Sequence, residues 1–154
     1  MKTVIYALSA LLFLSASGTA TAACSSKQEA RNKRNVVEFY NKAINDKDYA
    51  AAEKYIGKEY IQHNPMAADG KQGLKDFLDY AKKNLTQFHA DIKRVFADGN
   101  YVILHVHATR NPGDRGMAVM DIFRLDKSGK VVEHWDVAQP VPPPDKTHND
   151  NTMF

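Results

Sequence analysis

The sequence predicts an α+β domain in which three helices come first and an antiparallel sheet follows. Apolar residues recur at helical spacing in the first half of the chain, and from Phe88 onward they alternate with a period of two. The chain of 154 residues fits one domain, because a domain usually holds roughly 100–200 residues. We therefore expect a curved sheet that wraps a single helical layer.

Each of the three helices is predicted by a stripe of apolar residues. Asp46 or Asp48 can cap the second, shorter helix, and Gly57 can end it. The third helix is entered through Gly70 and Gly73. The stripes are Val36, Val37, Tyr40, Ala43 and Ile44 in the first helix, Tyr49, Ala52, Tyr55 and Ile56 in the second, and Leu74, Phe77, Leu78 and Ala81 in the third.

Four strands are predicted after the helices, and turns rich in Gly, Asn, Asp and Pro separate them, which favours an antiparallel meander. A further short extended stretch, KEYIQHNP at residues 58–65, lies between the second and third helices. After residue 138 several prolines exclude a central strand, so the chain must run over the surface. The four strands are expected at residues 87–97, 101–109, 117–125 and 130–138.

The first 22 residues are typical of a secretory signal peptide. Lys2 supplies the positive start, residues 4–14 supply the apolar stretch, and Ala20-Thr21-Ala22 supplies the cleavage site. This start predicts a secreted or periplasmic protein. The expected organisation is a signal peptide at 1–22, a linker at 23–28, the folded domain at 29–140 and a Pro-rich surface tail at 141–154.

Cys24 is the only cysteine of the chain, which excludes an intramolecular disulfide. It directly follows the expected cleavage region and resembles the acylated cysteine of a bacterial lipoprotein. Thr21 stands where such proteins usually carry a large aliphatic residue. A lipid anchor at Cys24 and a free thiol in the N-terminal segment therefore both stay open.

Charge and hydropathy exclude two classes of partner. The formal net charge is only +3, and the basic residues are interspersed with acidic ones. A nucleic-acid binder would show clustered basic residues. After the signal region no apolar run approaches the ~20 residues that span a bilayer. We expect neither nucleic-acid binding nor a membrane span.

Ionisable residues interrupt three of the predicted strands. Because side chains alternate between the faces of a strand, His105 and His107 share one face, and His134 and Asp136 share one face of the last strand. Asp121 sits among apolar neighbours and needs a partner, because an unpaired buried carboxylate is costly. One face of the sheet can therefore collect all five side chains, as a catalytic cavity would.

Simpler interpretations of these residues stay open. The strand histidines can lie at an exposed face with their ring nitrogens bonded to carbonyl groups. His63 and Asn64 precede Pro65, where a rigid turn can hold the imidazole over the mouth of a cavity. The same segment can also be an ordinary solvated turn.

Several motifs together resemble the SnoaL-like polyketide cyclase family of the nuclear-transport-factor-two-like superfamily. They are YIQHNP with the following Asp69-Gly70, Asp98-Gly99-Asn100 before a histidine-bearing strand, and DIFR followed by GKVVEHWDV. The resemblance covers roughly residues 29–140 and is nearest to a bacterial subgroup of predicted SnoaL-like aldol-condensation enzymes. It implies a cone-shaped, cystatin-like fold that encloses a pocket, and a homodimer joined through the outer face of the sheet.

The resemblance also implies roles for single residues. The acid/base aspartate of the cyclases matches Asp136, whereas the histidine paired with it matches Asp121, so the chain departs from the polyketide enzymes at that position. A neighbouring-strand histidine can supply the missing imidazole. We expect Asp136, Asp121, His105 and His107 to be catalytic, and His63, Asn64 and His134 to bind the substrate.

Three functions are consistent with these residues. The first is a secreted enzyme of the aldol, cyclase, isomerase or dehydratase type that needs no cofactor and no metal, in which Asp136 takes a proton next to a carbonyl group while a histidine or Asp121 donates to the carbonyl oxygen. The second is a module of the same fold that binds a small ligand or a peptide without turnover. The third is a metal site on His105 and His107, with Asp121 or His63 as a further ligand.

Both faces of the predicted strand at 101–109 are apolar. An antiparallel sheet that is buried on one face only would alternate more cleanly. We therefore expect a homodimer, formed through an outer face that carries Val102, Leu104, Val106, Glu133 and Trp135.

Overall fold

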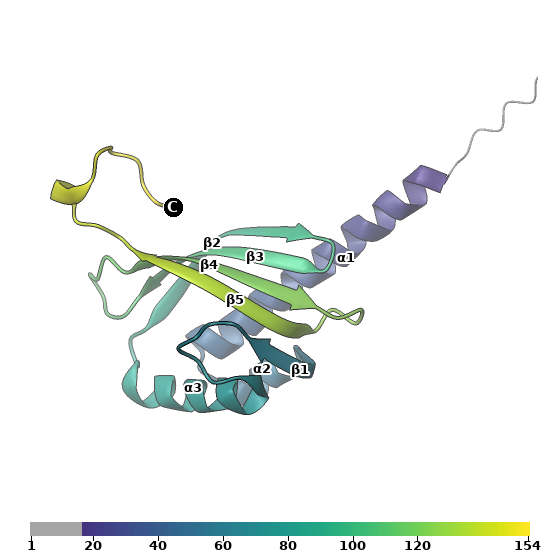
Figure 1. The fold of residues 1–154 in the computed structure, drawn as a ribbon, viewed down its shortest axis with the longest axis horizontal. Helices are drawn as coiled ribbons and strands as arrows, with labels where there is room; N and C mark the ends of the chain where they lie inside the picture. The colour runs from purple at the N-terminus through teal and green to yellow at the C-terminus, as the bar shows by residue number, and fades with distance from the viewer. Residues whose placement is uncertain (1–16) are drawn as a thin grey trace, which may run out of the picture.

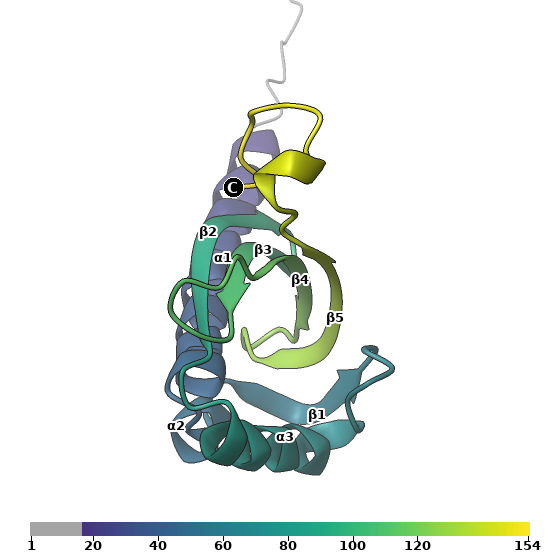
Figure 2. The ribbon, with the colours of Figure 1, turned by 90° about the vertical axis from the view of Figure 1, so that its left-hand side faces the viewer.

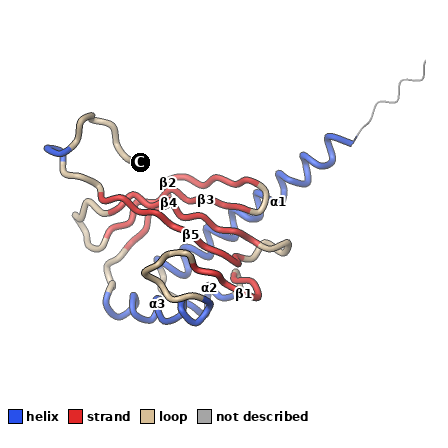
Figure 3. Tube along the Cα trace, viewed as in Figure 1, coloured by secondary structure: helices blue, strands red, loops and turns tan. Residues whose placement is uncertain are grey.

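The computed structural model describes residues 17–154, and most of the expected signal peptide, residues 1–16, lies outside the described residues. The elements follow the predicted order, with an extended segment between the second and third helices and four strands after the third (Figure 1). The strands lie side by side in one continuous sheet (Figure 3). Viewed from its end, this sheet is strongly curled, with α1 alongside it and α3 below β1 (Figure 2). The α+β class is confirmed.

Residues 17–154 contain three α-helices, although the limits of these helices differ from the predicted ones. α1 spans Ser17–Tyr40 and continues into a π-helical turn, η1, at Asn41–Asn45. It includes residues 23–28, expected as a linker, because this segment holds no Gly or Pro to disfavour a helix. α2 spans Tyr49–Glu53 and α3 spans Gly70–Asn84. No helix in the described part of the chain is long and apolar enough to cross a membrane.

Asp48 caps α2, as one of the two predicted alternatives, by accepting a hydrogen bond from the backbone N–H of Ala51 at 3.0 Å. Gly57 does not end this helix, and that prediction is wrong. It lies in β1, Ile56–Gln62, where a Cβ atom would be 2.4 Å from Cγ1 of Val132 in β5. A glycine is needed here because the two strands approach so closely.

The five strands lie in the order β1-β5-β4-β3-β2. The last four form the antiparallel meander that the alternation predicts, with limits within two residues of the expected ones: β2 at His89–Asp98, β3 at Tyr101–Thr109, β4 at Met117–Leu125 and β5 at Val131–Pro140. β1 is extended as expected, but it joins the sheet as a parallel strand beside β5. The sequence pattern did not show this pairing because the partner lies far along the chain.

The core lies between the concave face of the sheet and the helices. Val102, Leu104 and Val106 of β3 are completely buried there, in one cluster with Val36 and Phe39 of α1. The expectation that these three β3 residues form an outer dimer face is therefore wrong. Alternation shows which residues of a strand share a face, but it does not show which face is the inner one.

The register of the strands decides the faces. Leu104 pairs with Asp121, and Asp121 pairs with Asp136. Residues that pair across strands project to the same face, so both aspartates lie on the concave face with Leu104. The neighbouring positions face outward: His105, His107, Glu133 and Trp135.

The C-terminal tail leaves the sheet after Pro140 and returns over the outer face. It contains a short 3₁₀ turn, η2, at Pro144–Lys146. The ring centroid of Phe154 lies 5.6 Å from that of His105 and 4.3 Å from that of His107. The last residues of β5 pair only with β4, so Pro140 can stand in the strand without a second partner.

We expect Leu104→Ala and His105→Ala to distinguish the two faces of β3. Leu104 is fully buried, and truncation of a buried leucine costs about 2–5 kcal/mol of unfolding free energy. His105 faces outward and is only partly buried, so its truncation should cost less than about 1 kcal/mol. Denaturant unfolding followed by tryptophan fluorescence measures both changes. A larger loss for His105→Ala would contradict this assignment of the faces.

Candidate functional site

A cavity of about 560 Å³ lies between the concave face of the sheet and the helices. Its volume is in the range of small-molecule sites, roughly 300–1,000 Å³. Most of its wall is apolar and includes Phe39, Ile44, Leu74, Phe77, Phe88 and Val119. Two polar residues, Arg110 and Asp114, lie in the loop between β3 and β4, and a larger group comes from the end of α1, β1 and the segment after it, β4 and β5: Tyr40, Gln62, Asn64, Asp121, His134 and Asp136.

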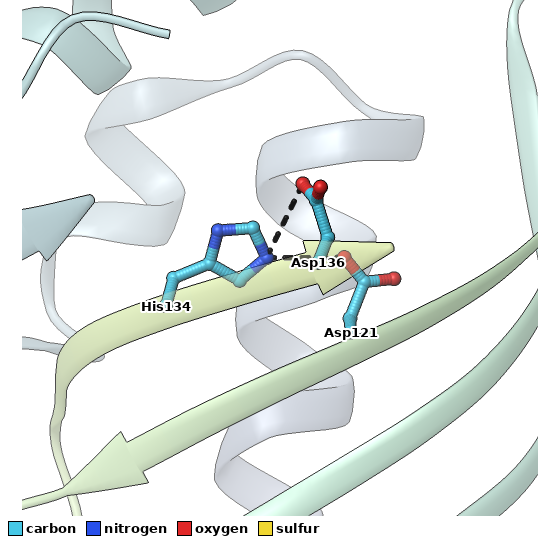
Figure 4. A group of neighbouring side chains, drawn as sticks. All are labelled: Asp121, His134 and Asp136. Atoms are coloured by element: carbon cyan, nitrogen blue, oxygen red, sulfur yellow. Dashed lines mark hydrogen bonds and ion pairs between the residues drawn. The ribbon is translucent and has the colours of Figure 1, made fainter. Parts of the chain in front are cut away.

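Asp121, His134 and Asp136 lie together in the wall of this cavity, on β4 and β5 (Figure 4). The two aspartates are paired directly across the strands. Nε2 of His134 lies 3.1 Å from Oδ1 of Asp121 and 3.9 Å from Oδ2 of Asp136. Facing carboxylates repel each other, so the imidazole beside both reduces the cost of holding them there.

The hydrogen bonds around His134 locate its protons. Oε1 of Gln62 accepts the backbone N–H of Asn64 at 2.9 Å, which fixes the orientation of the Gln62 amide. Nδ1 of His134 lies 3.0 Å from the same oxygen and must therefore carry a proton. On the other side, two acceptor lone pairs in buried contact would be unfavourable. One proton therefore lies between Nε2 of His134 and Oδ1 of Asp121.

Tyr40 completes the environment of Asp121. Its hydroxyl group donates to Oδ2 of Asp121 at 3.0 Å, and both side chains are buried. Burial, followed by the charge of Asp121 and this hydrogen bond, raises the pKa of Tyr40 well above its ordinary value. Tyr40 therefore stays a neutral donor.

Asp136 is held by Asn64, which follows β1. Nδ2 of Asn64 donates to both carboxylate oxygens of Asp136, at 2.8 and 2.9 Å. Oδ1 of Asn64 accepts the backbone N–H of Met66 at 2.8 Å, which fixes the orientation of this amide as well. The Asp136 side chain is 22% exposed, against 6% for Asp121. Asp136 is thus the more accessible of the two carboxylates.

His63 does not lie over the mouth of the cavity, so that expectation is wrong. Its ring stacks on Trp135 on the outer side of the sheet, with centroids 4.5 Å apart and planes 4° apart. Its Nε2 lies 2.8 Å from Oε1 of Glu133, and Oε2 of the same carboxylate accepts a hydrogen bond from Nε of Arg124. Successive side chains point to opposite faces of this extended segment. His63 therefore faces outward, whereas its neighbour Asn64 lines the cavity.

His105 and His107 are also separated from the site, which corrects the expected grouping of five side chains. Nε2 of His107 bonds the carbonyl oxygen of Arg115 at 2.8 Å, and Nδ1 of His105 lies 3.1 Å from Nη1 of Arg94. Both rings contact Phe154. The simpler interpretation describes them better: the two histidines lie on the outer face of the sheet, and the ring of His107 is hydrogen-bonded to a carbonyl group.

The third alternative, a metal site on His105 and His107 that includes Asp121, does not fit the structure, because the two histidines and Asp121 lie on opposite faces of the sheet. A different group can supply metal ligands in the described part of the chain, since one ligand atom each from Asp121, His134 and Asp136 lie within 4.8 Å of one another. In the structure these three side chains are hydrogen-bonded to one another or to Tyr40, Gln62 and Asn64.

Two site residues were missed from the sequence. Tyr40 was assigned to an apolar helical stripe, and Gln62 was given no role. The signal for Tyr40 was its hydroxyl group, because a buried tyrosine needs a hydrogen-bond partner and Asp121 was already expected to need one. No sequence signal pointed to Gln62, since its role depends on the parallel pairing of β1 with β5.

Residues 36–134 match the family of the SnoaL-like domain. The chain belongs to this family. The match confirms the resemblance that the motifs indicated, and with the curled sheet it confirms the cone-shaped fold. No curated protein matches the chain significantly.

Solved structures of similar fold carry several names. A candidate polyketide cyclase from Bacillus cereus ATCC 10987 is 19% identical, with a TM-score of 0.63 over 76% of this chain and 80% of that one. A candidate ketosteroid isomerase from Kribbella flavida DSM 17836 is 13% identical, with a TM-score of 0.63 over 82% and 94%. TsrD from Streptomyces laurentii is 18% identical, with a TM-score of 0.58 over 70% and 87%. At these identities the similarity shows the fold alone.

Tyr60, in the wall of the cavity, should make the free energy of unfolding depend on pH. Burial of Tyr60, followed by the charges of Asp121 and Asp136, raises its pKa far above the ordinary value. In the unfolded chain tyrosine ionises near pH 10, so above that pH the unfolded state releases a proton that the folded state keeps. The contribution of Tyr60 is therefore fully present below about pH 10 and is lost above it, by up to about 1.4 kcal/mol per pH unit.

Tyr60→Phe should make the unfolding free energy fall less steeply between about pH 9 and 11. Tyr80→Phe, at a position that is 57% exposed, is the matched control and should keep the slope of the wild type. Denaturant unfolding at each pH gives the slopes. Identical slopes in all three proteins would contradict the prediction.

Proposed function

We propose that this SnoaL-like chain is a cofactor-independent enzyme that removes a proton next to a carbonyl group of a small, largely apolar molecule. The observation that carries this proposal is Asp136, a partly exposed carboxylate in an apolar cavity beside a pair of groups that share a proton. A base and an acid that reach the same vacant space are what such chemistry requires.

In the proposed reaction Asp136 is the general base. The C–H bond next to the substrate carbonyl breaks, its proton moves to a carboxylate oxygen of Asp136, and the electron pair forms an enolate. The proton between His134 and Asp121 is available to the enolate oxygen, as a hydrogen bond or by transfer. The fixed amides of Gln62 and Asn64 hold both groups in place before the substrate binds.

The fate of the enolate sets the reaction type. Return of the proton to another carbon gives an isomerisation, attack on a second carbonyl gives an aldol condensation or cyclisation, and loss of a β-hydroxyl group gives a dehydration. The candidate polyketide cyclase and ketosteroid isomerase of the same fold support this range, because both names refer to keto compounds.

Asp136→Asn should lower turnover by about 10²–10⁴-fold, the usual effect of removing a general base. The assay is exchange of α-protons of small cyclic ketones in D₂O, followed by NMR. The variant should fold, and its Tm should be unchanged or higher, because one of two facing carboxylates becomes neutral.

Asp121→Asn is a comparison variant for stability, since it leaves the base in place but alters the partner of the proposed acid. It removes the charged partner of both His134 and Tyr40, so its Tm should fall. A large fall in Tm for Asp136→Asn with unchanged exchange would assign Asp136 a structural role. If the wild type binds apolar ketones but exchanges none of their protons, a binding module without turnover describes the protein.

We also propose that the chain is exported, through the signal sequence at residues 1–22, with Cys24 as the possible point of lipid attachment. The first turns of α1 extend beyond the sheet (Figure 1), so cleavage after Ala22 would leave the core cluster intact.

We further propose that the chain forms a homodimer through the outer face of the sheet. Large hydrophobic residues are exposed there, and they surround a shallow hollow of about 430 Å³. Such a patch is typical of a protein–protein contact. The exposed residues are Tyr101, Met120 and Val137, and the half-buried Ile122 and Trp135 complete the patch.

Sedimentation at micromolar concentration should show a dimer for the wild type and a monomer for Val137→Asp, because Val137 is 70% exposed and a buried charge would oppose association. Tyr80→Asp on α3, also at an exposed hydrophobic position, should stay dimeric. A monomeric wild type would refute the dimer.

A further inference from the structure

The cavity has two chemically different ends. One end holds the acidic side chains Asp121, which is buried, and Asp136; at the other end the loop between β3 and β4 contributes exposed residues, so we place the mouth at this loop. This loop contributes Arg110 and Asp114 to the wall. Within the described part of the chain, Arg110 is the only lysine or arginine that lines the cavity.

Asp114 is occupied by the backbone of its own loop. Its Oδ2 accepts the N–H of Arg110 at 3.0 Å, and its Oδ1 accepts the N–H of Gly116 at 2.8 Å. These two hydrogen bonds hold the pKa of Asp114 below its ordinary value. Gly116 has φ +73°, and a Cβ there would lie 2.1 Å from the carbonyl oxygen of Ala108. These contacts hold the backbone of the loop at Arg110 and Gly116.

The guanidinium group of Arg110 is left with unused donors. It is exposed and makes no side-chain hydrogen bond or salt bridge with any described residue, although its charge acts on Asp114. A guanidinium group offers five N–H donors in a planar fork that matches a carboxylate, sulfonate or phosphate. The mouth therefore presents a site for an anionic group.

The distance between the two ends sets the shape of the ligand. Leu104 pairs across the strands with Asp121, which pairs with Asp136. Arg110 follows Leu104 by six residues in the chain. An extended segment of that length spans about 20 Å, and the long arginine side chain shortens the gap. The carboxylates at the inner end repel a second anion, so a ligand with one negative end must enter with its apolar end first.

We propose that the cavity takes an elongated, apolar carbonyl compound with a single anionic group at one end, and that Arg110 binds this anion at the mouth. The inference rests on the proposed function for the carbonyl group, but the preference for an anion rests on Arg110 alone. Arg110 then sets which end of the ligand reaches Asp136.

Two fluorescent probes test the preference for an anion. 1-Anilinonaphthalene-8-sulfonate and N-phenyl-1-naphthylamine share the same aromatic skeleton, and only the first carries a sulfonate. Arg110→Gln should weaken binding of the sulfonate probe about 5- to 10-fold and leave the neutral probe unchanged. Added salt should weaken sulfonate binding in the wild type more than in this variant.

Arg115→Gln is the matched control, because Arg115 is exposed in the same loop but does not line the cavity. It should leave both probes unchanged. Ala138→Trp, at an exposed position in the wall, should block both probes and so locate them in the cavity. The proposal is overturned if Ala138→Trp has no effect, if Arg110→Gln spares the sulfonate probe, or if it weakens both probes equally.

The same measurements separate this inference from the proposed function. If the protein exchanges no protons but Arg110→Gln still weakens sulfonate binding, the cavity binds anionic ligands and the proposed chemistry is refuted. If proton exchange depends on Asp136 but Arg110→Gln has no effect on sulfonate binding, the proposed enzymatic function stands and only the preference for an anionic ligand is refuted.

Discussion

The arrangement of the cavity depends on two carboxylates that the register of β4 and β5 holds face to face at the edge of an apolar core. Each charge needs compensation in such surroundings. His134 shares a proton with Asp121, Tyr40 donates to Asp121, and Asn64 donates to Asp136. These groups come from β5, the end of α1 and the segment after β1. Groups from three separate parts of the chain therefore converge on the two paired aspartates.

The compensating groups are themselves fixed by the backbone. Gln62 and Asn64 each accept a backbone N–H with their amide oxygen, so neither amide can rotate without losing a hydrogen bond. The amide oxygen of Gln62 also contacts His134, and the amide nitrogen of Asn64 donates to Asp136. A site built this way needs little reorganisation when charge develops in a reaction, which is the main source of electrostatic catalysis.

Much of the fold was predictable because the hydrophobic period is regular. Alternation located the strands of the meander within two residues, and the need of Asp121 for a partner was recognised before the partners were known. The site was only partly predictable. Alternation inside a strand could not relate His105 to Asp121 on the next strand, since that depends on register. The roles of Gln62 and Tyr40 depend on contacts between segments that are far apart in the sequence, and hydrophobic periodicity does not predict such contacts.

The parallel strand β1 has a consequence for the order of folding. The meander can form by pairing neighbouring strands, whereas Asn64 and Asp136 are 72 residues apart and Tyr40 and Asp121 are 81 residues apart. Contacts of such long range form slowly, because a long loop must close first. We expect these contacts to be absent from the transition state for folding, so weakening them would accelerate unfolding while the folding rate stays nearly constant. The chain then completes its chemistry-bearing wall last, after the sheet that supports it.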